Sequence, residues 1–146
     1  RSLSPCEGGE MIYLCKTPEE TFELGRTLAA KLKGKEILIL TGDLGAGKTV
    51  FVQGVADFFG APSEEVGSPS FTLMNIYRGR VLLFHMDLYR MGEEEAEEIL
   101  GEIEGEGIVL VEWGEKVEWD LFEKASYRIT FRVSPDFTRE IDVQEV

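Results

Sequence analysis

The chain has 146 residues, 43% of them hydrophobic, which is enough for the core of one domain but too little for a second, large substrate domain. Its 28 acidic and 15 basic residues give a formal net charge of −13, which argues against direct, tight nucleic-acid binding without a basic partner. Two cysteines and one histidine are too few for a disulfide framework, a zinc site or a histidine cluster. We therefore expect one acidic domain with reduced thiols and a cytoplasmic location.

The first residues are predicted to be separate from that domain. Residues 1–10 are polar and turn-rich, and we expect them to be a loose arm or a cloning remnant ahead of the domain formed by residues 11–146. No apolar run approaches the roughly 20 residues of a membrane span, and the start does not resemble a signal peptide. We therefore expect no association with a membrane.

A strand and a helix are predicted next. Met11–Cys15 is a short apolar strand candidate, and Thr17–Glu20 is a capping box with proline at the first helical position. The helix should end at or before Gly34, which is a natural stop. Its predicted buried face consists of Phe22, Leu24, Leu28, Ala29 and Leu32.

The most informative stretch follows the apolar run Ile37–Leu40. Residues 42–49 read GDLGAGKT, which matches the phosphate-binding pattern G-x-x-x-x-G-K-[ST] between a strand and a helix. Glycines let successive backbone N–H groups point at phosphate oxygens at the positive end of the helix. Lys48 is predicted to reach the β- and γ-phosphates, and the Thr49 hydroxyl to ligate Mg²⁺. The predicted nucleotide-binding residues are Gly42, Asp43, Leu44, Gly45, Ala46, Gly47, Lys48 and Thr49.

An incidental glycine-rich turn is the alternative to a phosphate loop, but the agreement of motif, strand and helix favours nucleotide triphosphate binding. The helix from Lys48 should end at Gly60. Residues 61–70 are rich in proline, glycine and serine and are predicted to form a loop. Within residues 68–72, hydroxyl groups near the γ-phosphate suggest a nucleotide-dependent switch, with a plain connecting loop as the alternative.

The second half of the chain predicts a mixed sheet. Residues 71–77 and 81–86 read as an antiparallel hairpin around a glycine turn, and residues 129–143 as a terminal hairpin. The acidic segment Glu93–Glu106 reads as a solvated helix face, and Ile108–Val111 as a strand buried on both faces. Lys116–Lys124 is predicted to be a short helical connection. The expected fold is α/β: a single P-loop NTPase-like domain with a mixed parallel and antiparallel sheet flanked by helices.

Two acidic residues follow apolar strands and are candidates for catalysis. Asp87 comes after Val81–Met86 and Glu112 after Ile108–Val111, where carboxylates beside a phosphate loop would suit Mg²⁺. We expect Glu112 to ligate the metal together with Thr49, and Asp87 to orient the attacking water or share the metal. The two roles could be exchanged, and either acid could be an ordinary strand-end cap.

Two aromatic neighbours of these acids have competing interpretations. Trp113 could stack on a base or contact a partner, although a buried core tryptophan is equally consistent with the sequence. His85 points to the opposite face of its strand from the residues beside it, and we expect it to be structural rather than catalytic.

Several motifs together resemble the bacterial TsaE (YjeE) family. They are Gly42–Thr49 (GDLGAGKT), Ser68–Thr72 (SPSFT), His85–Arg90 (HMDLYR) and Val111–Lys116 (VEWGEK). The resemblance implies an ATPase that acts in forming N6-threonylcarbamoyladenosine at position 37 of tRNA. It also implies that TsaB and TsaD proteins are partners, and that tRNA is met only through their complex.

The resemblance also carries residue roles by position. It implies that Lys48 and Thr49 contact phosphate and Mg²⁺ and that Asp87 and Glu112 are the catalytic carboxylates. Trp113 becomes the neighbouring aromatic residue. The resemblance further places two hydroxyl residues near the nucleotide: Thr21, and Ser70 where the family usually has threonine.

Other nucleotide-dependent functions fit the residues less well. A GTPase would need a guanine-reading Asn/Thr-Lys-x-Asp motif, which does not occur. A P-loop kinase of small molecules, the main alternative, would need an acceptor pocket and several arginines around the phosphates. A third hypothesis is a nucleotide-dependent binding module whose hydrolysis is incidental, and it partly merges with the family reading because an acidic protein suits docking on other proteins.

Overall fold

The computed structural model describes residues 9–42, 47–62, 74–88, 91–113 and 124–146. The predicted arm at residues 1–10 lies almost wholly outside this part of the chain. The predicted switch at residues 68–72 and all but the last residue of the helical connection at 116–124 also lie outside it. In chain order the elements are β1 (Glu10–Cys15), α1 (Pro18–Ala29), β2 (Ile37–Gly42), α2 (Lys48–Phe58), β3 (Met74–Arg78), β4 (Leu82–Asp87), α3 (Glu93–Ile103), β5 (Ile108–Trp113), β6 (Tyr127–Val133) and β7 (Arg139–Glu145).

The strands form one mixed sheet, as predicted. Its order is β1-β7-β6-β2-β5-β4-β3, with β6, β2, β5 and β4 parallel to one another in the centre. The outer strands β3, β7 and β1 each pair in the antiparallel sense, and both predicted hairpins are present. The carboxyl ends of β2, β4 and β5 therefore meet at one edge of the sheet.

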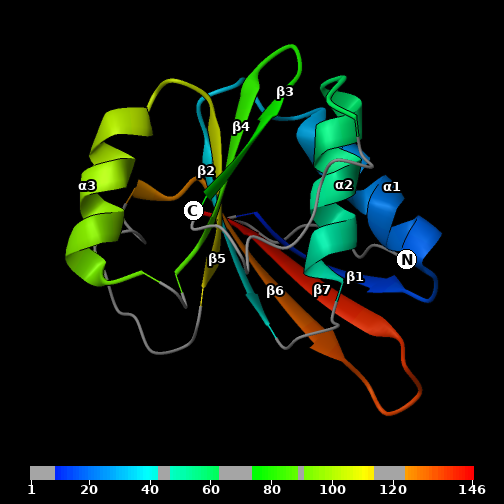
Figure 1. Cartoon of the computed structure of the whole chain (residues 1–146). Helices are drawn as coiled ribbons and strands as arrows, with labels where there is room; N and C mark the ends of the chain where they lie inside the picture. Colours follow the sequence, from blue (N-terminus) through cyan, green and yellow to red (C-terminus); the bar gives the residue numbers. More distant parts are fainter. Residues whose placement is uncertain (1–8, 43–46, 63–73, 89–90, 114–123) are drawn as a thin grey trace.

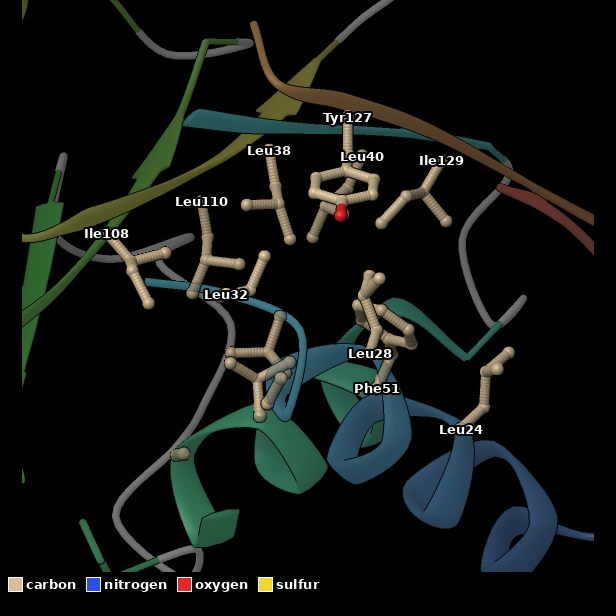
Figure 2. Close-up of a cluster of buried hydrophobic side chains, with 14 of the residues drawn as sticks. Leu24, Leu28, Leu32, Leu38, Leu40, Phe51, Ile108, Leu110, Tyr127 and Ile129 are labelled. Atoms are coloured by element: carbon tan, nitrogen blue, oxygen red, sulfur yellow. The ribbon is translucent and has the colours of Figure 1, made fainter. Parts of the chain in front are cut away.

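Helices cover both faces of the sheet. Figure 1 shows α1 and α2 on one side and α3 on the other. Alternate residues of the central strands enter two separate cores: in β5, Leu110 packs on the α1/α2 side and Val111 on the α3 side. Figure 2 shows the first core, where Leu38 and Ile129 from the sheet face Leu28 and Phe51 from the helices. The prediction that residues 108–111 are buried on both faces is confirmed.

Helix α1 begins with the predicted cap. Thr17 Oγ1 accepts a hydrogen bond from the Glu20 backbone N–H at 3.1 Å, and a Glu20 carboxylate oxygen accepts from the Lys16 N–H at 2.6 Å. The predicted buried face is wrong at Phe22, which is only partly buried. Thr21 lies fully inside instead, because α1 packs against α2 as well as against the sheet.

The contact between α1 and α2 depends on two glycines. A Cβ atom added to Gly25 would overlap the carbonyl oxygen of Phe51, and one added to Gly54 would overlap that of Phe22. The helix backbones can therefore approach only where these positions lack side chains. This contact fixes the helix that begins at Lys48 against α1.

The acidic helix α3 has the predicted solvated face and, opposite it, an apolar side. Ala96 and Leu100 are buried in the second core, while both glutamates between them, Glu97 and Glu98, face solvent. Within the described part of the chain, no helix is both long and apolar enough to cross a membrane.

Candidate active site

The site begins where β2 ends and α2 starts. Gly47 precedes the helix with a φ of 100°, a left-handed conformation that favours glycine. Lys48 Nζ donates a hydrogen bond to the Gly42 carbonyl oxygen at 2.8 Å, which joins the two ends of the predicted phosphate loop. Thr49 follows in the first turn of α2. The remaining predicted loop residues, at positions 43–46, lie outside the described residues: Asp43, Leu44, Gly45 and Ala46.

The two predicted acids lie side by side at the same edge of the sheet. Asp87 is the last residue of β4, and it pairs in register with Glu112 of the parallel strand β5. Glu112 pairs in turn with Leu40 of β2, two residues before Gly42. Since all three strands are parallel, the sheet topology alone brings both acids to the phosphate-loop edge.

Lys48 and Glu112 face each other inside this edge. Their nearest charged atoms, Lys48 Nζ and Glu112 Oε1, are 3.9 Å apart, and both side chains are largely buried at 11% and 13% exposure. Asp87 is also buried, with 9% of its surface exposed. The site therefore combines one buried cation with two buried acids, an arrangement that can hold a polyanion and a divalent cation together.

His85 is part of the site, and the sequence interpretation missed its connection to Glu112. His85 Nε2 lies 2.7 Å from Glu112 Oε2, and the Tyr77 hydroxyl lies 2.9 Å from His85 Nδ1. The imidazole is completely buried. Strand alternation was the available clue, because His85 lies two residues before Asp87 and so shares its face of β4.

A pocket of about 310 Å³ opens beside these residues. It lies between the amino ends of α1 and α2 and the start of β7, and its volume is in the range of small-ligand sites. The lining residues are Cys15, Lys16, Thr17, Pro18, Thr21, Gly47, Lys48, Thr49, Val50, Glu112 and Arg139.

The pocket includes predicted and unpredicted residues. Thr21, placed near the nucleotide by the family resemblance alone, is 2% exposed, and its Cγ2 would lie 3.4 Å from a Cβ added to Gly47. Arg139 comes from the terminal hairpin, and no local sequence pattern indicates its position here. Cys15 is a free thiol, and burial raises its pKa above the ordinary value of 9.0.

Two predicted nucleotide contacts are not placed by the structure. Ser70 lies outside the described residues, and Trp113 ends β5 with a side chain that also lies outside them. Among the residues lining the pocket, Glu112 is present and Asp87 is absent. The geometry therefore places Glu112, rather than Asp87, directly on the cavity.

The oxygen ligands that the protein offers at this site suit Mg²⁺ only when a phosphate group supplies further ligands. In the described ranges, no three or more histidine, cysteine, aspartate or glutamate side chains are grouped so as to hold a metal ion. Magnesium is commonly bound by one or two carboxylates together with substrate phosphates and water. The Thr49 hydroxyl and the Glu112 carboxylate, with Asp87 alongside, are donors of this kind.

Known proteins resemble this chain in both sequence and fold. A family model described as "Threonylcarbamoyl adenosine biosynthesis protein TsaE" matches residues 15–141. The tRNA threonylcarbamoyladenosine biosynthesis protein TsaE of Treponema pallidum is 39% identical over 136 residues, covering 91% of this chain and 99% of that protein. Its counterpart in Bacillus subtilis is 41% identical over 126 residues, covering 85% and 78%.

A solved structure is similar over nearly the whole chain. The crystal structure of YdiB from Bacillus subtilis superposes with a TM-score of 0.72 at 33% identity, covering 94% of this chain and 86% of YdiB. The predicted fold class is thereby confirmed, and so is the resemblance read from the sequence motifs. The chain belongs to the TsaE family.

Proposed function

We propose that this protein binds Mg²⁺–ATP and hydrolyses ATP in the formation of N6-threonylcarbamoyladenosine at position 37 of tRNA. Two relatives are named for threonylcarbamoyladenosine biosynthesis, and the family shares that name. The observation that carries the ATPase proposal is the buried pair of Lys48 and Glu112 at the end of the phosphate-loop strand, 3.9 Å apart. Their location beside Thr49 matches the needs of phosphoryl transfer.

Each residue has a defined part in this proposal. Lys48 exchanges the Gly42 carbonyl oxygen for phosphate oxygens, since both are hydrogen-bond acceptors. Thr49 and Glu112 would hold the magnesium ion, which would neutralise phosphate charge when bound. Asp87 orients the attacking water from the adjoining strand. Thr21 and Arg139 form the wall of the pocket away from the acids.

We propose that the protein acts in the cytoplasm on a complex of TsaB and TsaD proteins rather than on tRNA alone. The net charge of −13 opposes direct binding to a phosphate backbone. Exposed glutamates on α3 add to this repulsion and suit a basic protein surface. The tRNA is then met only through the complex.

The proposal is tested by measuring ATP hydrolysis alone, with candidate small-molecule acceptors, and with TsaB and TsaD proteins plus tRNA. We expect stimulation only in the last condition. There, Glu112→Gln and Asp87→Asn should each lower the rate by about 100-fold, because each removes a charge placed for the reaction. Glu23→Gln is the matched control, since Glu23 is an exposed acid on α1, away from α3 and from the pocket lining.

Two outcomes would overturn the proposal. Wild-type rates in both site variants would remove these acids from the mechanism. Stimulation by a small-molecule acceptor alone would instead favour the P-loop kinase, because a kinase requires its acceptor and not a protein complex.

A further inference from the structure

We propose that His85, held by Tyr77, is a positioning residue that fixes the carboxylate of Glu112 in one orientation. The proposal deepens the ATPase function proposed above and rests on it for its kinetic consequence. Its basis is that the two oxygens of Glu112 are divided between different partners. Oε2 lies 2.7 Å from His85 Nε2, whereas Oε1 lies 3.9 Å from Lys48 Nζ. One oxygen is thus held by the protein interior, and the other remains directed to Lys48.

The hydrogen bonds that link Tyr77, His85 and Glu112 run in one direction, with each donor pointing toward Glu112. An ionised carboxylate can only accept, so His85 Nε2 must carry the hydrogen that bonds Glu112. In an imidazole that carries this single hydrogen, His85 Nδ1 accepts from the Tyr77 hydroxyl at 2.9 Å, and the Tyr77 oxygen accepts from Asn75 Nδ2 at 3.3 Å. This pattern gives both ring nitrogens of His85 a partner and corresponds to one tautomer and one ring orientation.

Burial makes this arrangement rigid. The His85 side chain is fully buried and that of Glu112 is 13% exposed, so water competes weakly for their hydrogen bond. A glutamate has three side-chain torsions, and an unheld carboxylate would sample several orientations beside Lys48. Groups that hold a reacting or metal-binding side chain in this way commonly change its effectiveness without touching the substrate.

A direct test measures the NMR signal of the His85 imidazole in the absence of nucleotide. His85 is the chain's only histidine, so protein labelled with ¹⁵N-histidine gives one imidazole signal that needs no assignment. We expect the tautomer with hydrogen on Nε2, and chemical-shift changes in both Glu112→Gln and Tyr77→Phe. Leu83→Ala is the matched control, because Leu83 is buried on the same strand in the apolar core. A hydrogen on Nδ1 with Nε2 bare, or no shift in Glu112→Gln, would overturn the proposal.

The kinetic test separates positioning from a purely structural role. In the presence of the protein partners and tRNA, His85→Phe should lower kcat for ATP hydrolysis by about 10- to 100-fold. The separately measured Kd for Mg²⁺–ATP should change much less. His85→Gln, which restores an N–H donor toward Glu112, should recover most of the lost kcat. Tyr77→Phe should give a smaller loss, since it removes only the group that orients the ring.

The controls distinguish this proposal from the function on which it rests. Leu83→Ala should lower the melting temperature but keep kcat at temperatures where it stays folded. Equal loss of kcat in Leu83→Ala, or wild-type kcat in His85→Phe, would overturn the positioning role. If the wild-type protein hydrolyses no ATP in any condition, the proposed function fails, and the imidazole spectrum still decides whether His85 holds Glu112.

Discussion

The two faces of the central sheet are built from the same strands and yet differ in what they contain. On the α3 side, the described side chains that β4 and β5 contribute to the core are apolar, Met86 and Val111 among them. On the α1/α2 side the same strands begin with Leu83 and Ile108 in the core and end with Asp87 and Glu112 in the site. Alternation along a strand therefore lets one sheet support a continuous core on one face and a polar site at the edge of the other. Substitutions in the core on the α3 side should therefore change stability without changing the chemistry of the site.

The largest expected effect on stability alone comes from the α3 side. Leu100→Ala removes a side chain that is 4% exposed in the second core, and we expect a loss of about 2–5 kcal/mol in the free energy of unfolding. ATP binding and kcat at a temperature where the variant is folded should remain those of the wild type. Denaturant unfolding and nucleotide titration measure the two quantities. A parallel loss of nucleotide affinity would show that the faces are not independent.

A change between α1 and α2 should affect both properties. Gly54→Ala forces the added methyl group against the Phe22 carbonyl, so the helices must separate at a cost of about 1–3 kcal/mol. Because α2 begins at Lys48, we also expect weaker ATP binding. Thermal unfolding and calorimetric titration would record the two effects.

Gly101→Ala is the matched control for that variant. Gly101 lies inside α3, and a Cβ added there would meet no atom within 4 Å. This substitution should raise stability by about 0.5–1 kcal/mol, because alanine favours a helix over glycine. Equal destabilisation by both alanines would mean that close helix packing is not the reason for Gly54.

The smallest expected effect lies at the amino end of β2, away from the site. Burial opposes ionisation of Glu36, but its carboxylate accepts hydrogen bonds from the N–H groups of Lys33, Gly34 and Lys35, and the net result is a pKa below the ordinary 4.5. A lowered folded-state pKa contributes stability above pH 4.5, and this contribution is lost as the pH falls through the lower folded value.

Glu36→Gln should therefore lower stability by no more than about 1 kcal/mol at neutral pH, since the carboxylate is partly exposed. The difference from wild type should shrink as the pH falls below 4.5. Urea unfolding at a series of pH values measures it, with Glu98→Gln as the exposed control. A difference that grows toward low pH would have the wrong sign for this account.

Features with a local cause could be predicted from the sequence. The phosphate loop is a spacing motif, and the placement of Asp87 and Glu112 follows from two apolar runs that end at the same edge of a parallel sheet. The mixed sheet followed from a glycine turn, and the α1 cap from four consecutive residues.

Features that join distant segments could not be predicted in the same way. Gly25 and Gly54 read only as glycines inside helices, and their meeting depends on how α1 and α2 pack. The bond between His85 and Glu112 needs the register of β4 against β5, and Arg139 reaches the pocket only because β7 closes against β1.

The central claim is that Lys48 and the loop before it hold the phosphates of ATP. Calorimetric titration of ATP into the wild-type protein with magnesium tests it most directly, beside Lys48→Met, which keeps an unbranched side chain one atom shorter and removes the charge. We predict binding to the wild type, and affinity about 10- to 100-fold weaker in the variant at a temperature where both proteins are folded. Equal affinity in both proteins, or no binding by the wild type even with its protein partners added, would contradict the account.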